Sequence, residues 1–219
     1  MHRLIMTSNT YRQASAVTPQ QEQLDPGNRL LSRMPLRRME AEELRDSLLL
    51  VAGQLNEKRF GPAEEVKARA DGLVRSGKRR SIYVQQLRKQ PPSLLESFDL
   101  PAMNPNCLQR SESLVAPQAL HLLNDTAVRE MAAQFADRVL HAAGDEATNQ
   151  VQRIYWIALS RPPSAEEQTT CLQMLTRLTA QWTSQLTAAG QESKSPATRK
   201  ALTTLCHTVM NSAVFLYID

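Results

Sequence analysis

The sequence of 219 residues has few cysteines, few aromatic residues and no long apolar run. Its three cysteines lack a CxxC or CxxCH spacing, which excludes a dense disulfide scaffold, a thioredoxin-type redox site and an attached c-type haem. The longest apolar runs, residues 48–52 and 213–218, are far shorter than the roughly 20 residues that cross a bilayer. We therefore expect no membrane span. Seven glycines and 12 prolines are too few for a collagen-like or low-complexity chain.

The usual signatures of metal and cofactor sites are also missing. No HxxxH or HExxH spacing places two histidines on one helix face toward a metal, because the histidines are scattered at His2, His121, His141 and His207. No Walker or dinucleotide-binding glycine pattern occurs. The sequence therefore predicts neither a metal site nor a cofactor.

The composition is that of a globular protein, with 42% hydrophobic and 22% charged residues. The length fits one domain or two small ones. The charge is uneven: residues 1–110 hold 18 Lys and Arg against 12 Asp and Glu, and residues 111–219 hold 8 against 10. A basic half suggests an anionic partner such as nucleic acid, a sulfated or carboxylated glycan, or a membrane surface. The alternative is that the arginines pair with nearby carboxylates.

We divide the chain into three segments, which we expect to form one domain overall. Residues 1–60 should contain a short helix within residues 1–13, a surface loop over residues 14–28, and an amphipathic helix from Arg38. Residues 61–115 form a basic and proline-rich irregular segment. In it we expect an exposed helical stretch over residues 63–74, a short strand over residues 78–84, and no regular helix from Pro91 to about residue 106.

Residues 116–219 are expected to form a helical bundle. A short helix over residues 116–123 precedes a longer one capped by Asp125, and a third covers residues 151–159. Ser164 and Glu167 have capping-box spacing, and Ser195-Pro196 marks the start of the last helix. The predicted fold class is mainly α: a helical bundle with an irregular proline-rich tract and at most one short strand pair.

A series of short motifs in a fixed order carries a family resemblance. The motifs are His2–Gln13, Asp25–Leu31, Arg37–Asp46, Arg79–Tyr83, Phe98-Asp99, Pro117–Leu120, Leu123–Asp125, Arg153–Arg161 and Asn211–Tyr217. In this order they resemble the C-terminal domain of planctomycete cytochrome-c-associated proteins, known as domain of unknown function fifteen-fifty-three or planctomycete-specific domain one. The resemblance covers nearly the whole chain.

The resemblance implies a context for the chain. Such domains follow a sister domain of unknown function in large exported proteins, often with a cytochrome c module, so the expected location is exported or periplasmic. The expected partners are the upstream sister domain or the cytochrome c module. This chain starts directly at the first motif and has no signal peptide of its own, and we expect it to be a C-terminal fragment of that architecture.

Two carboxylates are the catalytic candidates. Glu42 and Asp46 are four residues apart on the expected helix and could act as general acid and base. On the same helix Arg38 and Arg45 could instead neutralise them in a structural ion-pair network. The catalytic hypothesis corresponds to a hydrolase acting on polysaccharide, and whether the chain is an enzyme stays open.

The basic candidates form an anion-binding set, which consists of His2, Arg3, Arg12, Arg38 and Arg45. With these residues the chain would be an interaction or ligand-binding domain, and an anionic glycan is the suggested ligand. Nucleic acid is not expected, because the basic segment over residues 75–89 has a single tyrosine for base stacking. Cys171 and Cys206 are expected in the core and Cys107 at the surface, and the sequence does not choose a disulfide pair.

Overall fold

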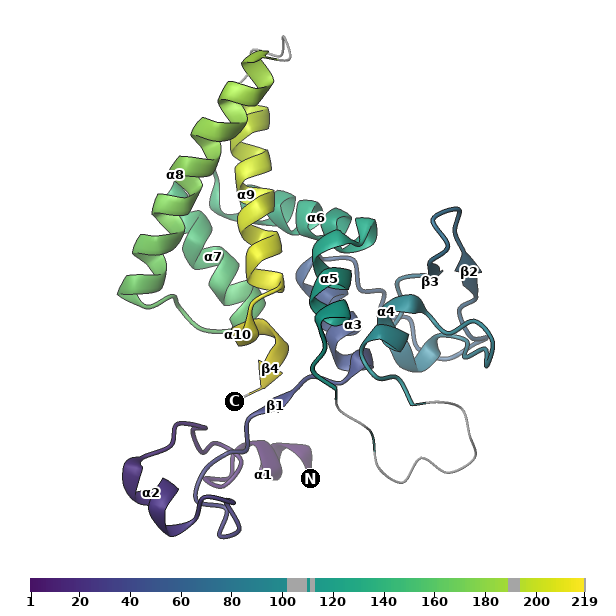
Figure 1. Ribbon diagram of the computed structural model, residues 1–219, viewed down its shortest axis with the longest axis vertical. Coiled ribbons are helices and arrows are strands. Elements are labelled where there is room, and N and C mark those ends of the chain that lie inside the picture. Colours follow the sequence, from purple (N-terminus) through teal and green to yellow (C-terminus); the bar gives the residue numbers. More distant parts are fainter. Residues whose placement is uncertain (102–109, 111–112, 189–193, 219) are drawn as a thin grey trace. The chain divides into compact units, whose positions relative to one another are not determined.

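The computed structural model describes residues 1–101, 110, 113–188 and 194–218. They form two compact units. Unit 1 comprises Met1–Met39 with Leu216–Asp219, and unit 2 comprises Glu40–Phe215. The compact units thus divide the chain at a different place from the sequence segments. Figure 1 shows that most of unit 2 is helical, and the mainly α fold class is confirmed.

The second half of unit 2 is a helical bundle. It contains α5 (Ala116–Asn124), α6 (Thr126–Ala143), α7 (Ala147–Leu159), α8 (Ala165–Ala188), α9 (Lys194–Met210) and, except for its last residue, α10 (Ala213–Leu216). Helices α8 and α9 run side by side, and α6 packs against α9 (Figure 1). Their apolar faces build a core from side chains that the helical periodicity predicts: Val128, Ala132, Phe135, Ala136, Val139, Leu202, Leu205, Cys206, Val209 and Met210.

The predicted helix starts in this bundle are largely confirmed. The Asp125 carboxylate accepts a hydrogen bond from the Ala127 amide, 2.6 Å away, and caps α6. In the capping box of α8, the Glu167 carboxylate accepts from the Ser164 amide, and the Ser164 hydroxyl accepts from the Glu167 amide. The last helix begins at Lys194, so Ser195 lies in its first turn rather than at its cap.

The first long helix starts later than expected. Helix α3 spans Ala41–Val51, because Glu40 is extended (φ −67°, ψ 159°) and the Glu43 carboxylate accepts from its amide at 3.0 Å. The predicted apolar face of α3 is buried at Ala41, Leu44, Leu48, Val51 and Ala52. Arg38 lies outside the helix, and its placement on the helix face beside Glu42 was wrong.

Residues 63–74 are not helical. They contribute β2 (Val66–Ala68), which pairs antiparallel with β3 (Val74–Ser76) in a hairpin. The turn explains the difference: Gly72 has φ +81°, and the Asp71 carboxylate accepts from the Leu73 amide at 3.0 Å. An Asp-Gly pair is a hairpin signal, and here it outweighs the weak helical pattern.

Two further short elements differ from the expectation. The predicted strand over residues 78–84 is a short 3-10 helix, η1 (Ser81–Tyr83), because Asp46 accepts hydrogen bonds from the Ser81 amide and hydroxyl. The proline-rich tract contains a short helix, α4 (Ser93–Ser97), directly after Pro92. Prolines are tolerated there because a helix start needs no intrahelical amide donors. Cys107 and Pro105 lie outside the described residues.

Unit 1 contains α1 (His2–Met6), α2 (Pro19–Leu24) and the antiparallel strands β1 (Arg37–Arg38) and β4 (Tyr217–Ile218). The helix α1 agrees with the prediction, whereas α2 lies in the expected loop and starts with a Thr18–Gln21 capping box. The described residues therefore hold two short strand pairs, one more than expected. None of their helices has the length and apolar content needed to span a bilayer.

Candidate functional site

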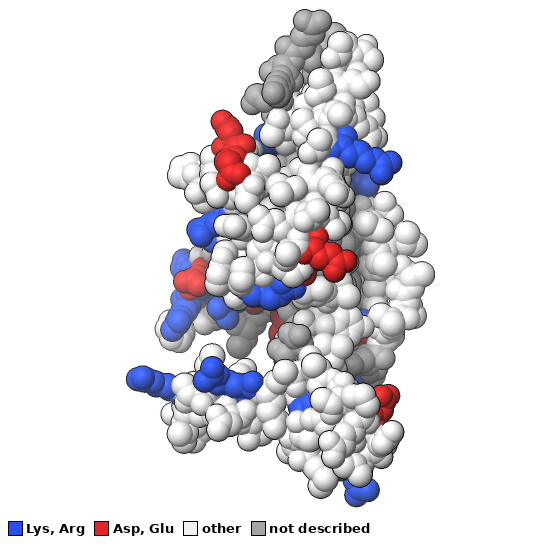
Figure 2. All heavy atoms as spheres, turned by 90° about the vertical axis from the view of Figure 1, so that its left-hand side faces the viewer, with Lys and Arg blue, Asp and Glu red and all other residues white. Residues whose placement is uncertain are grey.

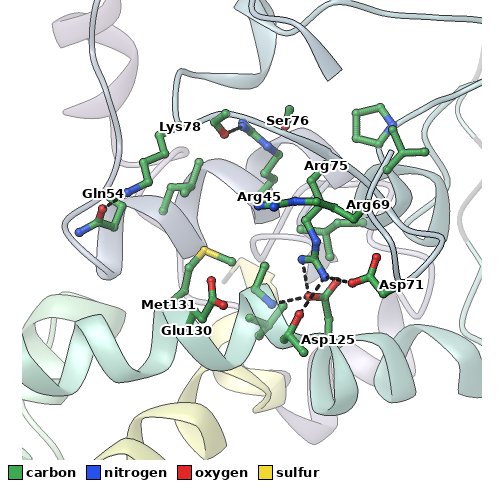
Figure 3. A pocket seen from close by; sticks show the side chains of 18 of the residues that line it. Arg45, Gln54, Arg69, Asp71, Arg75, Ser76, Lys78, Asp125, Glu130 and Met131 are labelled. Carbon is green, nitrogen blue, oxygen red and sulfur yellow. Dashed lines mark hydrogen bonds and ion pairs between the residues drawn. The ribbon is translucent and has the colours of Figure 1, made fainter. Parts of the chain in front are cut away.

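A pocket of about 530 Å³ lies within unit 2. Its walls come from α3, the β2–β3 hairpin, the residues around Pro92 and the first turns of α6 (Figure 3). Its volume lies within the range of roughly 300–1,000 Å³ that is typical of small-molecule sites. The pocket combines charged side chains with apolar ones, among them Leu49, Val74, Leu94, Val128 and Met131.

Arg75 organises one wall of this pocket. Its guanidinium donates to Asp125 Oδ1 at 2.6 Å, to Asp71 Oδ2 at 3.1 Å and to Thr126 Oγ1 at 3.0 Å (Figure 3). Burial raises the pKa of Asp125, but the hydrogen bonds from His121, Arg75 and the Ala127 amide outweigh it, and the pKa lies well below its usual range. The hairpin is thereby fixed to the start of α6.

A series of close polar contacts continues from Asp125 away from the pocket. His121 Nε2 lies 3.0 Å from Asp125 Oδ2, and His121 Nδ1 lies 2.9 Å from Ser97 Oγ. In the tautomer that carries its proton on Nε2, that proton lies on the side of the Asp125 carboxylate, and Nδ1 accepts from the serine hydroxyl. Together with Arg75, these contacts join α4, α5, α6 and the hairpin.

A hydroxyl, an imidazole and a carboxylate in series resemble the triad of a serine hydrolase. Such a site also needs amide donors aimed at the developing oxyanion. The amides that follow Ser97 donate within their own turn: Phe98 to the Leu94 carbonyl, Asp99 to that of Glu96, and Leu100 to that of Leu95. The local geometry therefore supports a tether between helices rather than a nucleophile.

Two cationic side chains stand at the pocket with little compensation. Lys78 Nζ donates to the neutral amide oxygen of Gln54 (Figure 3). Within the described part of the chain, the exposed Arg69 guanidinium has no hydrogen bond or ion pair. Glu130 is an exposed carboxylate on the α6 side of the same pocket. The pocket thus places the positively charged groups of Arg69 and Lys78 beside apolar side chains.

Arg45 is one of the predicted anion contacts, and it lines this pocket. It is buried, and its guanidinium donates to the carbonyls of Gly77 and Arg79 at 2.6 and 2.9 Å and to Ser81 Oγ at 3.1 Å. These bonds hold the segment after the hairpin on α3. An anion would have to replace these hydrogen bonds, so the Arg45 guanidinium is not available to bind one.

The predicted acid and base are each held by other groups. Arg110 donates to both carboxylate oxygens of Glu42, at 2.6 and 3.0 Å. Partial burial raises the pKa of Glu42, but the bonds from Arg110 outweigh it and the pKa is lowered. Asp46 accepts from Ser81 and contacts Arg45. A general acid needs a raised pKa, and the arrangement at Glu42 has the opposite effect.

The remaining predicted anion contacts lie in unit 1. His2 and Arg3 are exposed in α1, and Arg12 is exposed in the turns that follow. Arg38 is buried in β1, where it is paired with Tyr217. Sequence reasoning missed Arg69, Arg75 and the His121–Asp125 contact. The Asp71-Gly72 turn and the four-residue spacing of His121 and Asp125 were the signals that could have found them.

No group of three or more His, Cys, Asp or Glu side chains in the described ranges is arranged to hold a metal ion. Cys171 and Cys206 are buried and free, as core residues. Cys107 lies among the residues without a description. The basic run at residues 78–80 is not a continuous surface, because Arg79 is buried and donates to the carbonyls of Lys58, Phe60 and Pro62.

Comparison with known proteins gives one family. Residues 1–175 match the family PSD1, described as a protein of unknown function (DUF1553). The chain belongs to this family. No curated protein and no solved structure matches it. The match to PSD1 includes the whole of α3, the hairpin, α4 and α6, so the pocket lies within the matched residues.

Proposed function

We propose that this PSD1 chain is a ligand-binding domain and that the pocket of unit 2 takes an anionic ligand. The observation that carries the proposal is the pair of cationic side chains at the pocket, Arg69 and Lys78, beside apolar residues. Arginine binds carboxylate and sulfate groups in a bidentate manner, and lysine adds a mobile positive charge. The amides of Gln54 and Gln134 provide further hydrogen-bonding groups in the lining.

An anionic glycan is the ligand class that we propose. A uronic acid or sulfated sugar offers one acidic group together with many hydroxyls, which suits a lining of arginine, lysine, glutamine and carboxylate groups. We also propose the wider context: a domain of an exported, redox-linked protein whose partners are an upstream sister domain or a cytochrome c module. A polysaccharide hydrolase with Glu42 as its acid is disfavoured, because Arg110 lowers the pKa of that carboxylate.

The test is a titration of the chain with a carboxylated, a sulfated and an uncharged oligosaccharide of equal length. We expect calorimetry to show binding of an acidic oligosaccharide that weakens with salt. The double variant R69Q/K78Q should bind at least tenfold more weakly, since a hydrogen bond to a charged group contributes about 1.5–3 kcal/mol.

The matched control is R88Q/K89Q, which removes the same charge from two exposed side chains outside the pocket. It should bind as the original chain does. If both double variants lose affinity equally, binding follows net charge and the pocket proposal is wrong. It is also wrong if none of the three oligosaccharides binds.

A further inference from the structure

Unit 1 has almost no apolar core. Helices α1 and α2 contain no buried residue. Among the described residues of the unit, Met39 is the one buried apolar side chain. Large apolar side chains are exposed along the whole segment, at Met1, Leu4, Ile5, Met6, Tyr11, Val17, Leu24, Leu30, Leu31 and Leu36.

Polar contacts fix the turn that displays two of these leucines. The Asp25 carboxylate accepts from the amides of Arg29 and Leu30, both at 2.8 Å. Arg33 donates to the carbonyls of Asp25 and Pro26 at 3.1 and 2.9 Å. The turn is therefore ordered by hydrogen bonds, while the Leu30 side chain stays 80% exposed.

Leu31 adds an independent sign of function. It adopts φ +54°, in the left-handed region that bulky residues rarely occupy, and its side chain is 60% exposed. Burial in the chain does not compensate this strain. Strained backbone that displays an exposed apolar side chain is a feature of binding sites.

The charge of the chain is concentrated in the same segment. Residues 1–39 contain six arginines, no lysine, and two acidic residues, Glu22 and Asp25, a net charge of +4. Residues 40–219 contain 20 basic and 20 acidic side chains, so they are neutral. Figure 2 shows blue Lys and Arg atoms with little red in unit 1. A partner for this surface must be acidic.

The composition favours a protein over a lipid surface. Protein interfaces are enriched in arginine, methionine and tyrosine and depleted in lysine. A segment that lies on a membrane is a long amphipathic helix with Trp, Phe or Leu on one face. Helix α1 has five residues, and residues 1–39 contain no Trp or Phe.

We propose that unit 1 is a docking surface for a folded protein domain that presents an acidic rim around an apolar patch. Leu30 and Leu31 are central apolar contacts, and Arg3, Arg12 and Arg29 face the acidic rim. Within the described residues, the side chains of these three arginines make no ion pair that docking would have to break. The inference is independent of the pocket in unit 2.

The experiment selects partners from a displayed library of small folded domains whose surfaces vary in Asp, Glu and apolar content, with the full chain as bait. We expect the selected domains to combine acidic and apolar surface residues. Their affinity should fall at least tenfold for L30S/L31G and for R3Q/R12Q/R29Q, and it should fall with salt. Glycine at position 31 suits the positive φ, so this variant should fold.

The controls are Leu114→Ser and Ile82→Ser, which remove exposed apolar side chains from unit 2, and both should leave binding unchanged. Four results would overturn the proposal. The first is that no selected domain depends on unit 1, and the second is that L30S/L31G lowers the unfolding temperature of the free chain, which would mean that these leucines pack internally. The third and fourth are that the chain sediments with anionic vesicles, or self-associates, through the same residues.

Discussion

Arg75 and Asp125 are 50 residues apart in sequence and meet at 2.6 Å, with side chains that are 17% and 6% exposed. This contact completes one wall of the pocket, because it holds strand β3 of the hairpin against the N-cap residue of α6. The same carboxylate caps α6 through the Ala127 amide and contacts His121. One side chain thus joins three elements.

Replacing Arg75 by alanine should destabilise unit 2 by roughly 3 kcal/mol, because the buried Asp125 carboxylate loses its compensating charge. Chemical denaturation measures this loss. Arg69→Ala is the matched control on the same hairpin and should change stability by less than about 0.5 kcal/mol. The double variant R75A/D125N should be less destabilised than R75A, since it leaves no buried charge unpaired. Additive losses would contradict the coupling.

Stability should fall in acid through the capping box of α8. Hydrogen bonds from Arg161, together with those from Ser164, lower the pKa of Glu167 from 4.5 to about 2. A lowered pKa in the folded state contributes stability that is present above pH 4.5 and is lost as the pH falls toward 2. Unfolding by urea at several pH values measures the slope.

The variant Glu167→Gln should flatten that slope between pH 4.5 and 2. Its neighbour Glu166 is exposed, and its carboxylate makes no hydrogen bond or ion pair with the described residues, so Glu166→Gln is the control and should keep the original slope. Equal slopes for the two variants would show that the Arg161–Glu167 contact does not contribute to folding.

The sequence predicted the bundle well and the pocket poorly, for a physical reason. Helices α6 and α9 are long and their apolar residues repeat with the helical period, so periodicity alone finds their buried faces. The pocket depends on a hairpin of three-residue strands, where the Asp71-Gly72 turn decides the structure and periodicity has no length to act over. The Asp71-Gly72 pair is a local signal of this turn, but the charged residues around it have a spacing that also suggests a helix.

The site residues were harder to predict because their roles depend on contacts between distant segments. Arg45 has the spacing of a surface ion-pair residue on α3, yet it is buried against carbonyls more than 30 residues away. Glu42 is neutralised by Arg110, not by an arginine on its own helix. No spacing rule within one helix contains this information.

Gly77 should not tolerate a side chain. A Cβ atom there would lie 2.1 Å from Glu64 Oε1, and that carboxylate accepts from the amides of Lys78 and Arg79 at 3.2 and 3.0 Å. Gly77→Ala must displace the carboxylate and should cost about 1–3 kcal/mol, the cost of leaving such groups unsatisfied. Thermal unfolding measures it.

Gly27→Ala is the control, since the nearest atom to its added Cβ is Arg29 Cγ at 3.8 Å. It should be neutral or slightly stabilising. In the double variant E64A/G77A the clash is absent, so its stability should equal that of E64A alone. A double variant that loses the sum of both costs would place the strain elsewhere.

The two bundle cysteines should be unreactive until the chain unfolds. Burial raises the pKa of the Cys206 thiol well above its usual value, and Asp137 adds to the effect. Burial also raises the pKa of Cys171, whose Sγ lies 3.8 Å from the Tyr155 hydroxyl. Since the thiolate is the reactive form, both should resist a disulfide reagent at pH 8.

The measurement uses the variant C107S, so that only these two thiols are counted. Ellman's reagent should find no reactive thiol in buffer and two in urea. Adding Thr169→Cys, an exposed position on α8, should give one fast-reacting thiol and shows that the reagent works on the folded chain. If Cys171 reacts in buffer as fast as this reporter, α8 opens from α7 without global unfolding, because the Tyr155–Cys171 contact joins those two helices.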